Sequence, residues 1–510
     1  MSIDLSLDRI RKLLNFLPPY TRPTIHVAGT NGKGSVCAVV SSILSATSPP
    51  FVTGRFNSPH LVSILDCICI DNAPVSNEVY TTARELVERT NAENGIAASN
   101  FELLTCTAFL IFERAAVDVV VLEVGMGGRL DATNAVPDDC VLVSALTAVD
   151  LDHQAFLGNT IEAIAREKAA IARPGKPFVI GPQLHPEAAE AARAVAQAAG
   201  AVLAPPALVT AVNEARADAN DVLATIVRLG APPPRPVKIS MTGFPEPVHA
   251  SLPLHGDHQL ANLEVATGII SALLTQPVAQ RFGIQFQARI TPTTLARGIL
   301  RTRWPGRLSY HTVRLAQPSI SDEDPLGITV LADGAHNPAS ASALANYLLD
   351  LFQKSPSESS PRSLVLTYIL GLSHSPPKTP AQTLEPLFAL RNRIPQCVHV
   401  RIGAALLRFT PPENMPWVRP VPPSDMRAAI KSAIPAIASD WELWPEPDAA
   451  APEGDDDPTR TLEQALQWAA ARRRDGEDAL VVVAGSLYLV ADFYRFLDRL
   501  GQAQGIWGAN

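Results

Sequence analysis

Thr24-Ile25-His26-Val27-Ala28-Gly29-Thr30-Asn31-Gly32-Lys33-Gly34-Ser35 is a short β-branched run that ends abruptly in glycines, one lysine and a hydroxyl. Helix-forming residues follow from Val36 to Leu44, so the segment predicts a strand, a loop and a helix. Glycines permit the tight turn in which backbone N–H groups and the positive end of a helix face a phosphate chain. Lys33 adds a mobile positive charge, and the loop therefore predicts a triphosphate-binding site.

This loop departs from the usual G-x-x-x-x-G-K-[ST] spacing. Gly34 separates Lys33 from Ser35, and the first glycine is closer to the lysine than that pattern requires. The plain alternative is a glycine-rich turn between a strand and a helix. We favour the phosphate loop, because the lysine and the hydroxyl lie where phosphate binding requires them.

The bulk composition is typical of a soluble globular protein. The chain has 510 residues, enough for two to four domains at roughly 150 residues per domain. A net charge of −8, with 47% hydrophobic and 18% charged residues, excludes a disordered chain and one that coats nucleic acid. We find no signal peptide and no apolar stretch of membrane-spanning length. We therefore expect a cytoplasmic protein without nucleic-acid or membrane partners.

The six cysteines are scattered through apolar runs and lack the paired spacing of a zinc site. We expect buried, reduced thiols, with no disulfide and no zinc. These residues are Cys37, Cys67, Cys69, Cys106, Cys140 and Cys397.

Strand and helix signals alternate in the first part of the chain, as in a doubly wound α/β domain. The continuous β-branched run Val117–Gly125 suits a central parallel strand that is covered on both faces. Glu123 comes at its carboxyl end, where open α/β sheets gather ligands. A carboxylate there, beside a phosphate loop, predicts a site for nucleotide-bound magnesium.

The composition changes to Gln, Pro, Ser, Asp and Glu between residues 315 and 326, which is typical of a linker. We predict an N-terminal domain (residues 1–312), a linker (313–327) and a C-terminal α/β domain (328–510). Two further segments are expected to carry little chemistry. Residues 192–236 predict a surface helix and a mobile excursion, and the acidic, Pro-rich residues near 441–458 predict a surface insertion.

Motifs spread over nearly the whole chain resemble those of the folylpolyglutamate synthase and dihydrofolate synthase family, in the Mur ligase superfamily. The matching segments, in the family's order, are Gly29–Ser35, Ser58–Leu61, Leu122–Asn134, Asp152-His153, Glu167-Lys168, His258–Asn262, Trp304–Arg307 and Asp333–Pro338. The resemblance implies an N-terminal P-loop-type, doubly wound ATPase domain and a smaller, Rossmann-like C-terminal α/β domain.

The same resemblance implies an ATP-dependent amide ligase. A substrate carboxylate attacks the γ-phosphate to give an acyl phosphate, and the amino group of L-glutamate then displaces phosphate. Carboxylates are poor acylating agents, so such an enzyme needs ATP to supply a leaving group and cations to hold the developing charge. The implied substrates are 7,8-dihydropteroate, L-glutamate and ATP, and we expect a monomer.

The resemblance also implies the roles of individual residues. The expected ATP contacts are Gly29, Thr30, Asn31, Gly32, Lys33, Gly34, Ser35, Asn262, Arg307, Asp333 and His336. One Mg²⁺ is expected on Ser58 and Glu123, and a second on Glu123 and His153, with Lys168 carbamoylated by CO₂ as a further ligand. Lys33, His153 and Lys168 would be catalytic. The pterin is expected near Ser99, Asn100, Phe101, Glu102, Leu130, Asp131 and Ala132.

Three of these residues have plainer alternatives. Without the resemblance, we would interpret Lys168 as an ordinary exposed lysine on a helix, because lysines are rarely buried. Carbamoylation needs a neutral amine, so the site would have to lower its pKa. His336 could be a loop histidine that caps the next helix. Phe101 could be a core aromatic at the start of a helix.

Two departures from the family's pattern bear on the substrate, besides a conservative change at Met126. Asp66-Cys67 stands where the family usually has a Glu-Arg pair, which puts in doubt any substrate contact of that arginine. Asn31 stands where eukaryotic folylpolyglutamate synthases usually have lysine, and those enzymes have longer N-terminal regions. Asn31 and the shorter N-terminal region both favour dihydrofolate synthesis. The alternatives are a folylpolyglutamate synthase acting on tetrahydrofolate, a bifunctional enzyme, a P-loop kinase and a non-catalytic nucleotide-binding module.

Overall fold

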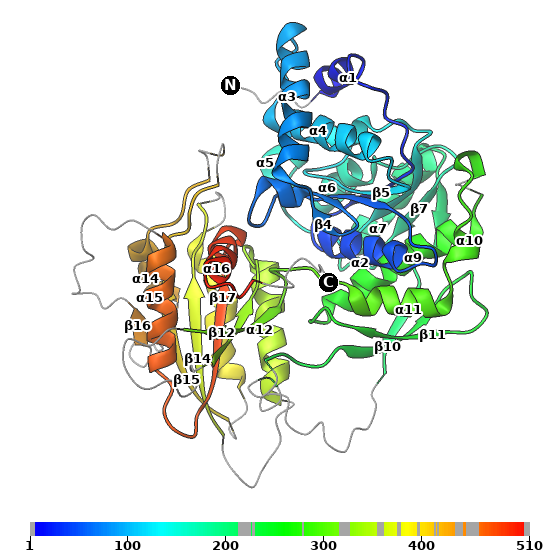
Figure 1. Ribbon diagram of the computed structural model, residues 1–510. Helices are drawn as coiled ribbons and strands as arrows, with labels where there is room; N and C mark the ends of the chain where they lie inside the picture. Colours follow the sequence, from blue (N-terminus) through cyan, green and yellow to red (C-terminus); the bar gives the residue numbers. More distant parts are fainter. Residues whose placement is uncertain are drawn as a thin grey trace.

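Two layered α/β units lie side by side in the computed structural model of this protein (Figure 1). The structure describes residues 6–212, 226, 230–277, 280–315, 327–353, 362–374, 379–394, 398–412, 415, 418–433, 442–444 and 458–503. We call the unit built before residue 309 the first half, and the unit built from residue 309 onward the second half.

An eight-stranded sheet forms the centre of the first half, in the order β4-β3-β2-β5-β1-β6-β7-β8. The strands are β1 (Thr24–Ala28), β2 (Thr53–Phe56), β3 (Ile68–Ile70), β4 (Ala73–Pro74), β5 (Val119–Glu123), β6 (Val141–Leu146), β7 (Pro177–Ile180) and β8 (Val202–Ala204). β1 is parallel to both β5 and β6, with Val27 opposite Glu123. Because β1 and β5 run in the same direction, the phosphate loop and Glu123 emerge at the same edge of the sheet.

Helices cover both faces of this sheet, which confirms the doubly wound fold. The helical segments are α1 (Asp8–Leu14), α2 (Lys33–Ser45), η1 (Ile64–Cys67), α3 (Asn77–Glu93), α4 (Asn100–Arg114), η2 (Ala132–Ala135), α5 (Gln154–Leu157), α6 (Ile161–Ala169), α7 (Pro186–Ala198), α9 (His258–Thr275), η3 (Gln280–Phe282), α10 (Phe286–Arg289) and α11 (Pro292–Arg301). α2 and α9 pack on one face, and α1 and α4 on the other. α2 is apolar on nearly all sides, because it lies between the sheet, α9 and α11.

The expectation for residues 192–236 was wrong in part. After α7, the chain forms β8 and then joins a three-stranded antiparallel sheet, in the order β11-β10-β9. Its strands are β9 (Leu208–Ala211), β10 (Arg235–Ser240) and β11 (Val248–Leu252). Val237 and Ile239 alternate along β10 and are buried in the same core cluster as α9. Residues 213–225 and 227–229, where the mobile excursion was expected, lie outside the described residues.

The second half is a six-stranded sheet in the order β12-β13-β17-β14-β15-β16. Its elements are β12 (Ser309–Arg314), β13 (Gly327–Ala332), α12 (Pro338–Gln353), β14 (Arg362–Leu370), α13 (Pro380–Ala389), η4 (Leu390–Arg393), β15 (Val398–Leu406), α14 (Pro423–Ala433), β16 (Glu442–Trp444), α15 (Pro458–Ala471), β17 (Asp478–Ala484) and α16 (Leu487–Arg499). α12, α13 and α14 bury side chains in one core cluster, and α15 and α16 in another. Only β12 is antiparallel, as expected of a Rossmann-like sheet with an added edge strand.

Two boundaries differ from those expected. Residues 309–312, assigned to the N-terminal domain, form most of β12 and pair with β13 in the second sheet. Glu442–Trp444, assigned to a surface insertion, is an edge strand paired with β15. The rest of the insertion up to residue 457, and residues 316–326 of the linker, lie outside the described residues. The domain limits otherwise stay a prediction.

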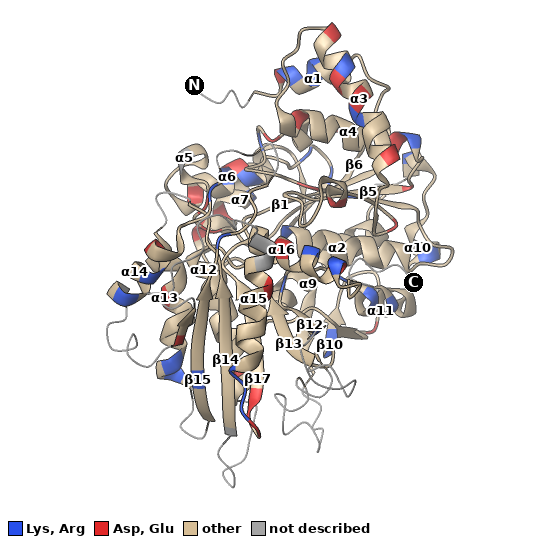
Figure 2. Ribbon diagram, turned by 60° about the vertical axis from the view of Figure 1, so that its left-hand side comes forward, with Lys and Arg blue, Asp and Glu red and all other residues tan. Residues whose placement is uncertain are grey.

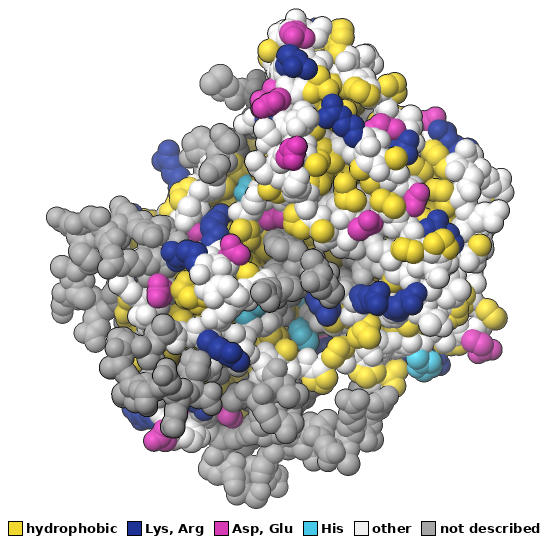
Figure 3. Space-filling model, viewed as in Figure 1, with side chains coloured by type: hydrophobic (Ala, Val, Ile, Leu, Met, Phe, Trp, Pro, Cys, Tyr) yellow, Lys and Arg dark blue, Asp and Glu magenta, His cyan; other side chains and the backbone are white. Residues whose placement is uncertain are grey.

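Charged residues of both signs are interspersed along the helices of both halves (Figure 2). Hydrophobic side chains on the face seen in Figure 3 are mixed with polar and charged ones over the first half. Among the described helices, none combines the length and apolar character that a bilayer crossing requires. Five of the cysteines are buried thiols, as expected, and Cys397 lies outside the described residues.

Candidate active site

A cavity of about 450 Å³ lies between the two halves, at the edge of the first sheet where β1 and β5 end. It brings together most of the residues that the sequence analysis selected. Those that line it are Thr30, Asn31, Gly32, Lys33, Gly34, Ser35, Ser58, Glu123, His153, Asn262, Arg307, Asp333 and His336. Its volume is in the range of small-molecule sites in proteins.

The glycines of the phosphate loop allow other side chains to approach it closely. Gly32 has φ +93° and immediately precedes α2, and a Cβ atom there would collide with the side-chain amide of Asn262. A Cβ at Gly34 would collide with the ring of Trp304. Only glycine fits both positions. Gly32 to Ser35, at the start of α2, line the cavity, where the N–H groups of a helix N-terminus can bind an anion.

Lys33 and Glu123 face each other at the base of the cavity. The Lys33 Nζ atom lies 3.9 Å from Glu123 Oε1 and donates a hydrogen bond to the Thr30 carbonyl oxygen at 3.2 Å. The Asn57 side chain donates to Glu123 Oε2 at 2.6 Å. Burial raises the pKa of Glu123, and the nearby Lys33, Asn57 and Arg307 oppose that rise. The carboxylate is thus buried and held in place, with one oxygen directed toward the lysine.

The donors around Glu123 fit a magnesium ion that shares its coordination with phosphate and water. Mg²⁺ prefers oxygen ligands, keeps several waters and is usually held by one or two carboxylates with substrate phosphates. Here the Glu123 carboxylate and the Ser58 hydroxyl line the same cavity. Over the described part of the chain, no three His, Cys, Asp or Glu side chains converge on one point. The protein therefore offers partial ligation next to the phosphate loop, rather than a complete cage.

His153 lies at the rim of the cavity. It precedes α5 with φ +50°, and its side chain is 47% exposed. The His153 Nε2 atom lies 3.6 Å from Asp152 Oδ2. The residue therefore faces the cavity, but from a more solvated position than Glu123.

Lys168 is buried, which excludes the exposed-lysine alternative. Only 2% of the residue is accessible, and its Nζ donates to the Gly29 carbonyl oxygen at 3.0 Å. Burial lowers the pKa of Lys168 to about 7; Lys33 adds to this lowering, and Asp152 and Asp131 oppose it. A substantial share of the amine is thus neutral near pH 7, as carbamoylation requires.

Asp333, directly after β13, holds the segment that leads into β12. Its Oδ2 accepts the Leu308 N–H at 2.8 Å, and its Oδ1 accepts the Ala335 N–H at 2.9 Å. The Arg307 guanidinium is one of the groups that oppose the rise in the pKa of Asp333 caused by burial. This carboxylate therefore fixes the position of the arginine-bearing segment at the cavity wall.

His336 is not the cap of α12. Its Nδ1 lies 2.9 Å from the Gly334 carbonyl oxygen, and its backbone N–H donates to Ser340 Oγ. Asn337 instead accepts the Ser340 N–H at 2.9 Å. The His336 ring is thus braced by its own loop at the cavity, while Asn337 makes the capping contact at the start of α12.

The seven expected pterin contacts do not line the cavity, and several have structural roles. Ser99 and Glu102 form a capping box at the start of α4, and Glu102 is also 3.1 Å from Arg9 Nε. Phe101 and Asp131 both lie against Gly125, which does line the cavity. Phe101 and Asp131 thus lie behind a residue of the cavity wall, and the pterin assignment of all seven residues stays a prediction.

Sequence reasoning missed two residues that hold the predicted ones. Asn57 fixes Glu123, as described above. Gln259 donates to Ser35 Oγ at 3.4 Å and accepts from Asn262 at 2.9 Å. Gln259 and Asn262 are both on α9. Their i,i+3 spacing within the motif His258–Asn262 was the signal available in the sequence.

Comparison with known proteins gives the family. The model described as "Dihydrofolate synthetase, C-terminal domain" matches residues 317–496. The chain is 32% identical to the dihydrofolate synthetase of Saccharomyces cerevisiae, over 97% of this chain and 98% of that protein. It belongs to the dihydrofolate synthase and folylpolyglutamate synthase family. This membership confirms the resemblance inferred from the motifs.

Matches to other members of this family also cover nearly the whole chain. The probable dihydrofolate synthetase of Schizosaccharomyces pombe is 29% identical over 98% of this chain and 99% of that protein. The solved structure of Mycobacterium tuberculosis folylpolyglutamate synthase complexed with ADP is 27% identical, with a TM-score of 0.68, and covers 97% of this chain and 95% of that one. The two-unit architecture is therefore that of the folylpolyglutamate synthase structures.

Proposed function

We propose that this protein joins L-glutamate to 7,8-dihydropteroate, using ATP, to give 7,8-dihydrofolate, ADP and phosphate. One observation carries the proposal: the phosphate loop, the Lys33–Glu123 pair at 3.9 Å and the second-half residue Asp333 meet in one cavity. The full-length similarity to yeast dihydrofolate synthetases supports the choice of substrate.

In this proposal the first half binds the triphosphate. The N–H groups of the first turn of α2 and the Lys33 ammonium hold the β and γ phosphates in line for attack by the pterin carboxylate. Mg²⁺, when bound at Ser58 and Glu123, would supply positive charge to the phosphate oxygens. The attack yields an acyl phosphate and ADP. The amino group of glutamate then attacks the acyl carbon, and phosphate leaves as the amide forms.

We further propose that Lys168 becomes carbamoylated and completes a second Mg²⁺ site with Glu123 and His153. Its neutral amine can react with CO₂, and the product carries a carboxylate-like group. The burial of Lys168 and its hydrogen bond to the Gly29 carbonyl support this role, because they place the amine behind the phosphate loop.

The second half has a separate task. Asp333 and His336 come from the loop after β13 and would cover the nucleotide from the far side of the cavity. An acyl phosphate is hydrolysed readily by water, so a site enclosed by two halves protects the intermediate. We infer that Asn262 and Arg307 complete the ATP contacts.

The substrate choice is tested with purified protein, ATP and radiolabelled glutamate, with either dihydropteroate or tetrahydrofolate. We expect labelled amide product and ADP only when dihydropteroate and glutamate are both present. Product from tetrahydrofolate alone would instead assign a folylpolyglutamate synthase, and product from both a bifunctional enzyme. A phosphorylated product without glutamate would assign a kinase, and ADP binding without turnover a nucleotide-binding module.

We propose that the enzyme acts as a cytoplasmic monomer on small-molecule substrates. Light scattering of the purified protein tests the first part, and fractionation of cells that produce it tests the second. A dimer mass, or recovery in a membrane or organelle fraction, would contradict the respective statement.

A further inference from the structure

The loop that carries Ser58 leaves the first half and packs into the second. Leu61 is only 8% exposed and belongs to the core cluster of β13, β17 and α16. Its Cδ1 lies 3.4 Å from the position of a Cβ on Gly306, which Val490 and Leu487 of α16 also surround. A side chain from the first half is therefore part of the hydrophobic core of the second.

A polar contact accompanies this packing. Arg495 of α16 donates to the Val62 carbonyl oxygen at 3.2 Å and to Asp492 Oδ1 at 2.7 Å. Asp492 is fully buried, and its other oxygen accepts the Thr410 N–H at 2.8 Å. Arg495 is thus held by Asp492 within α16 and also donates a hydrogen bond to the loop of the first half.

Asp66 gives the loop the shape that makes these contacts. Its Oδ1 accepts the Leu61 N–H at 2.9 Å, and its Oδ2 accepts the N–H groups of Val62 at 2.8 Å and Ser63 at 3.0 Å. The residue is 8% exposed. Three backbone donors converge on one buried carboxylate, so its removal would leave all three without a partner.

The other end of the loop holds Glu123. The Asn57 side chain donates to Glu123 Oε2, and the Ser58 backbone N–H also donates to this carboxylate. The ten residues from Asn57 to Asp66 therefore connect the acid beside the phosphate loop to α16 of the second half.

We propose that Asp66 and Arg495 are positioning residues, which hold Ser58 and Glu123 in their metal-binding arrangement by fixing this loop to α16. The proposal rests on the proposed function only in taking Ser58 and Glu123 as magnesium ligands. Asp66 is also where this sequence departs from the Glu-Arg pattern, and its contacts are within the protein.

The test uses Asp66→Asn and Arg495→Met in the full chain, with Arg499→Met as the matched control. Arg499 is also on α16, but it is exposed and lies over Phe496, 5.9 Å from the ring centre to Cζ. Two readouts are needed: hydrogen exchange at the amides of Leu61, Val62 and Ser63 without ligand, and ADP affinity measured by calorimetry with and without Mg²⁺.

We expect both variants to exchange these three amides about tenfold faster, because a charge-assisted hydrogen bond is lost or the loop is released. We expect the gain in ADP affinity that Mg²⁺ brings to fall about tenfold, with ADP affinity in the absence of Mg²⁺ unchanged. Arg499→Met should match the wild type in both readouts.

Unchanged hydrogen exchange at these amides would overturn the proposal. Faster exchange would also overturn it if Mg²⁺ still raised the ADP affinity as much as in the wild type. If Asp66→Asn does not fold, Arg495→Met decides by the same criteria. Glutamate ligation by the wild-type enzyme is a separate result. Its absence would overturn the proposed function, whereas the Mg²⁺ gain in ADP affinity would still test the role of the loop.

Discussion

Burial of Lys168 opposes folding at neutral and acidic pH. An ammonium in a buried position loses its hydration, which explains why its pKa falls to about 7. The unfolded chain keeps the ordinary lysine pKa, so between about pH 7 and 10.5 the unfolded state binds more protons than the folded state. The free energy of unfolding therefore rises with pH across this window, and the full penalty applies below it.

Lys168→Met should remove this penalty. In buffer depleted of CO₂, we expect the variant to melt at a higher temperature than the wild type at pH 6 to 7, with the difference shrinking toward pH 10. Activity should be lost. Thermal melts at several pH values, with the ligation assay, measure both. A melting difference that does not vary with pH would contradict the lowered pKa.

Lys168→Ala tests the carbamate itself. We expect activity to fall by about 100-fold or more, as for the loss of an electrostatic group at a phosphoryl-transfer site. Added formate or acetate should restore part of it, because a small carboxylate can occupy the space left by the side chain. The ligation assay with increasing acid concentration measures this effect. Wild-type activity in the variant would remove Lys168 from the mechanism.

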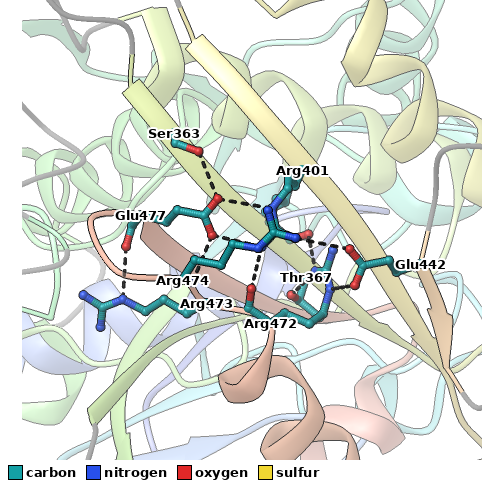
Figure 4. A network of polar contacts seen from close by, with 9 residues as sticks. Ser363, Thr367, Arg401, Glu442, Arg472, Arg473, Arg474 and Glu477 are labelled. Atoms are coloured by element: carbon teal, nitrogen blue, oxygen red, sulfur yellow. Dashed lines mark hydrogen bonds and ion pairs between the residues drawn. The ribbon is translucent and has the colours of Figure 1, made fainter.

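Elements differ in how strictly they depend on single positions. Gly32 immediately precedes α2 with φ +93°, and the side chain of Asn262 from α9 lies where a Cβ atom on Gly32 would be. The start of α2 therefore depends on glycine at this position. In the second half, charged side chains from β15, β16 and the end of α15 form a network near the start of β17 (Figure 4). The first arrangement lies at the cavity, and the second lies at the sheet of the second half.

Gly32→Ala should disrupt nucleotide binding. The added methyl group collides with Asn262 and is strained by the positive φ, so we expect ADP affinity to fall at least about tenfold. Gly95→Ala is the control, because Gly95 also has positive φ, +57°, but has open space where a Cβ would lie. Calorimetry with ADP compares the two. Equal affinities would show that the close approach to Asn262 is dispensable.

Glu477→Gln should destabilise the second half. Glu477 Oε2 accepts from Arg401 at 2.9 Å and from the Arg474 N–H at 3.0 Å. Loss of its charge weakens both, and we expect a loss of about 1–3 kcal/mol in the free energy of unfolding. Glu88→Gln is the control, since its pair with Arg84 is on an exposed helix face and is worth under about 0.5 kcal/mol. Thermal melts of both variants measure the loss of stability. A loss for Glu477→Gln that is no larger than that for Glu88→Gln would contradict this expectation.

At the scale of the whole molecule, the cavity belongs to neither half alone. The first half contributes the phosphate loop, Ser58 and Glu123, whereas Asp333 and His336 come from the second. Leu61 and Arg495 join the halves next to it. A change in the relative position of the halves would therefore alter the cavity directly.

Asp333→Ala and His336→Ala should weaken the use of ATP without unfolding the first half. For Asp333→Ala we expect the KM for ATP to rise about tenfold, because the Leu308 and Ala335 N–H groups lose their partner and the arginine-bearing segment shifts. Steady-state kinetics, with circular dichroism as a check on folding, measure this. Wild-type kinetics in both variants would contradict the role of the second half.

Local patterns determined much of this protein. The strand, loop and helix at Thr24–Ser35, the buried run ending at Glu123 and the order of βα units follow from periodicity and from the placement of glycines, which act over a few neighbouring residues. The motifs on these elements likewise indicated which residues would meet at the carboxyl edge of the sheet.

Tertiary structure alone decided the rest, because it depends on contacts between distant parts of the chain. The burial of Lys168 follows from its contact with Gly29, 139 residues away. The role of Asp66 follows from the fit of its loop to α16, where Arg495 and Val62 are 433 positions apart. The β10 strand gains its core face only when α9 packs beneath it. No local pattern specifies which distant surface will remove a side chain from water, and that removal set the pKa values and the positions of the polar groups at the site.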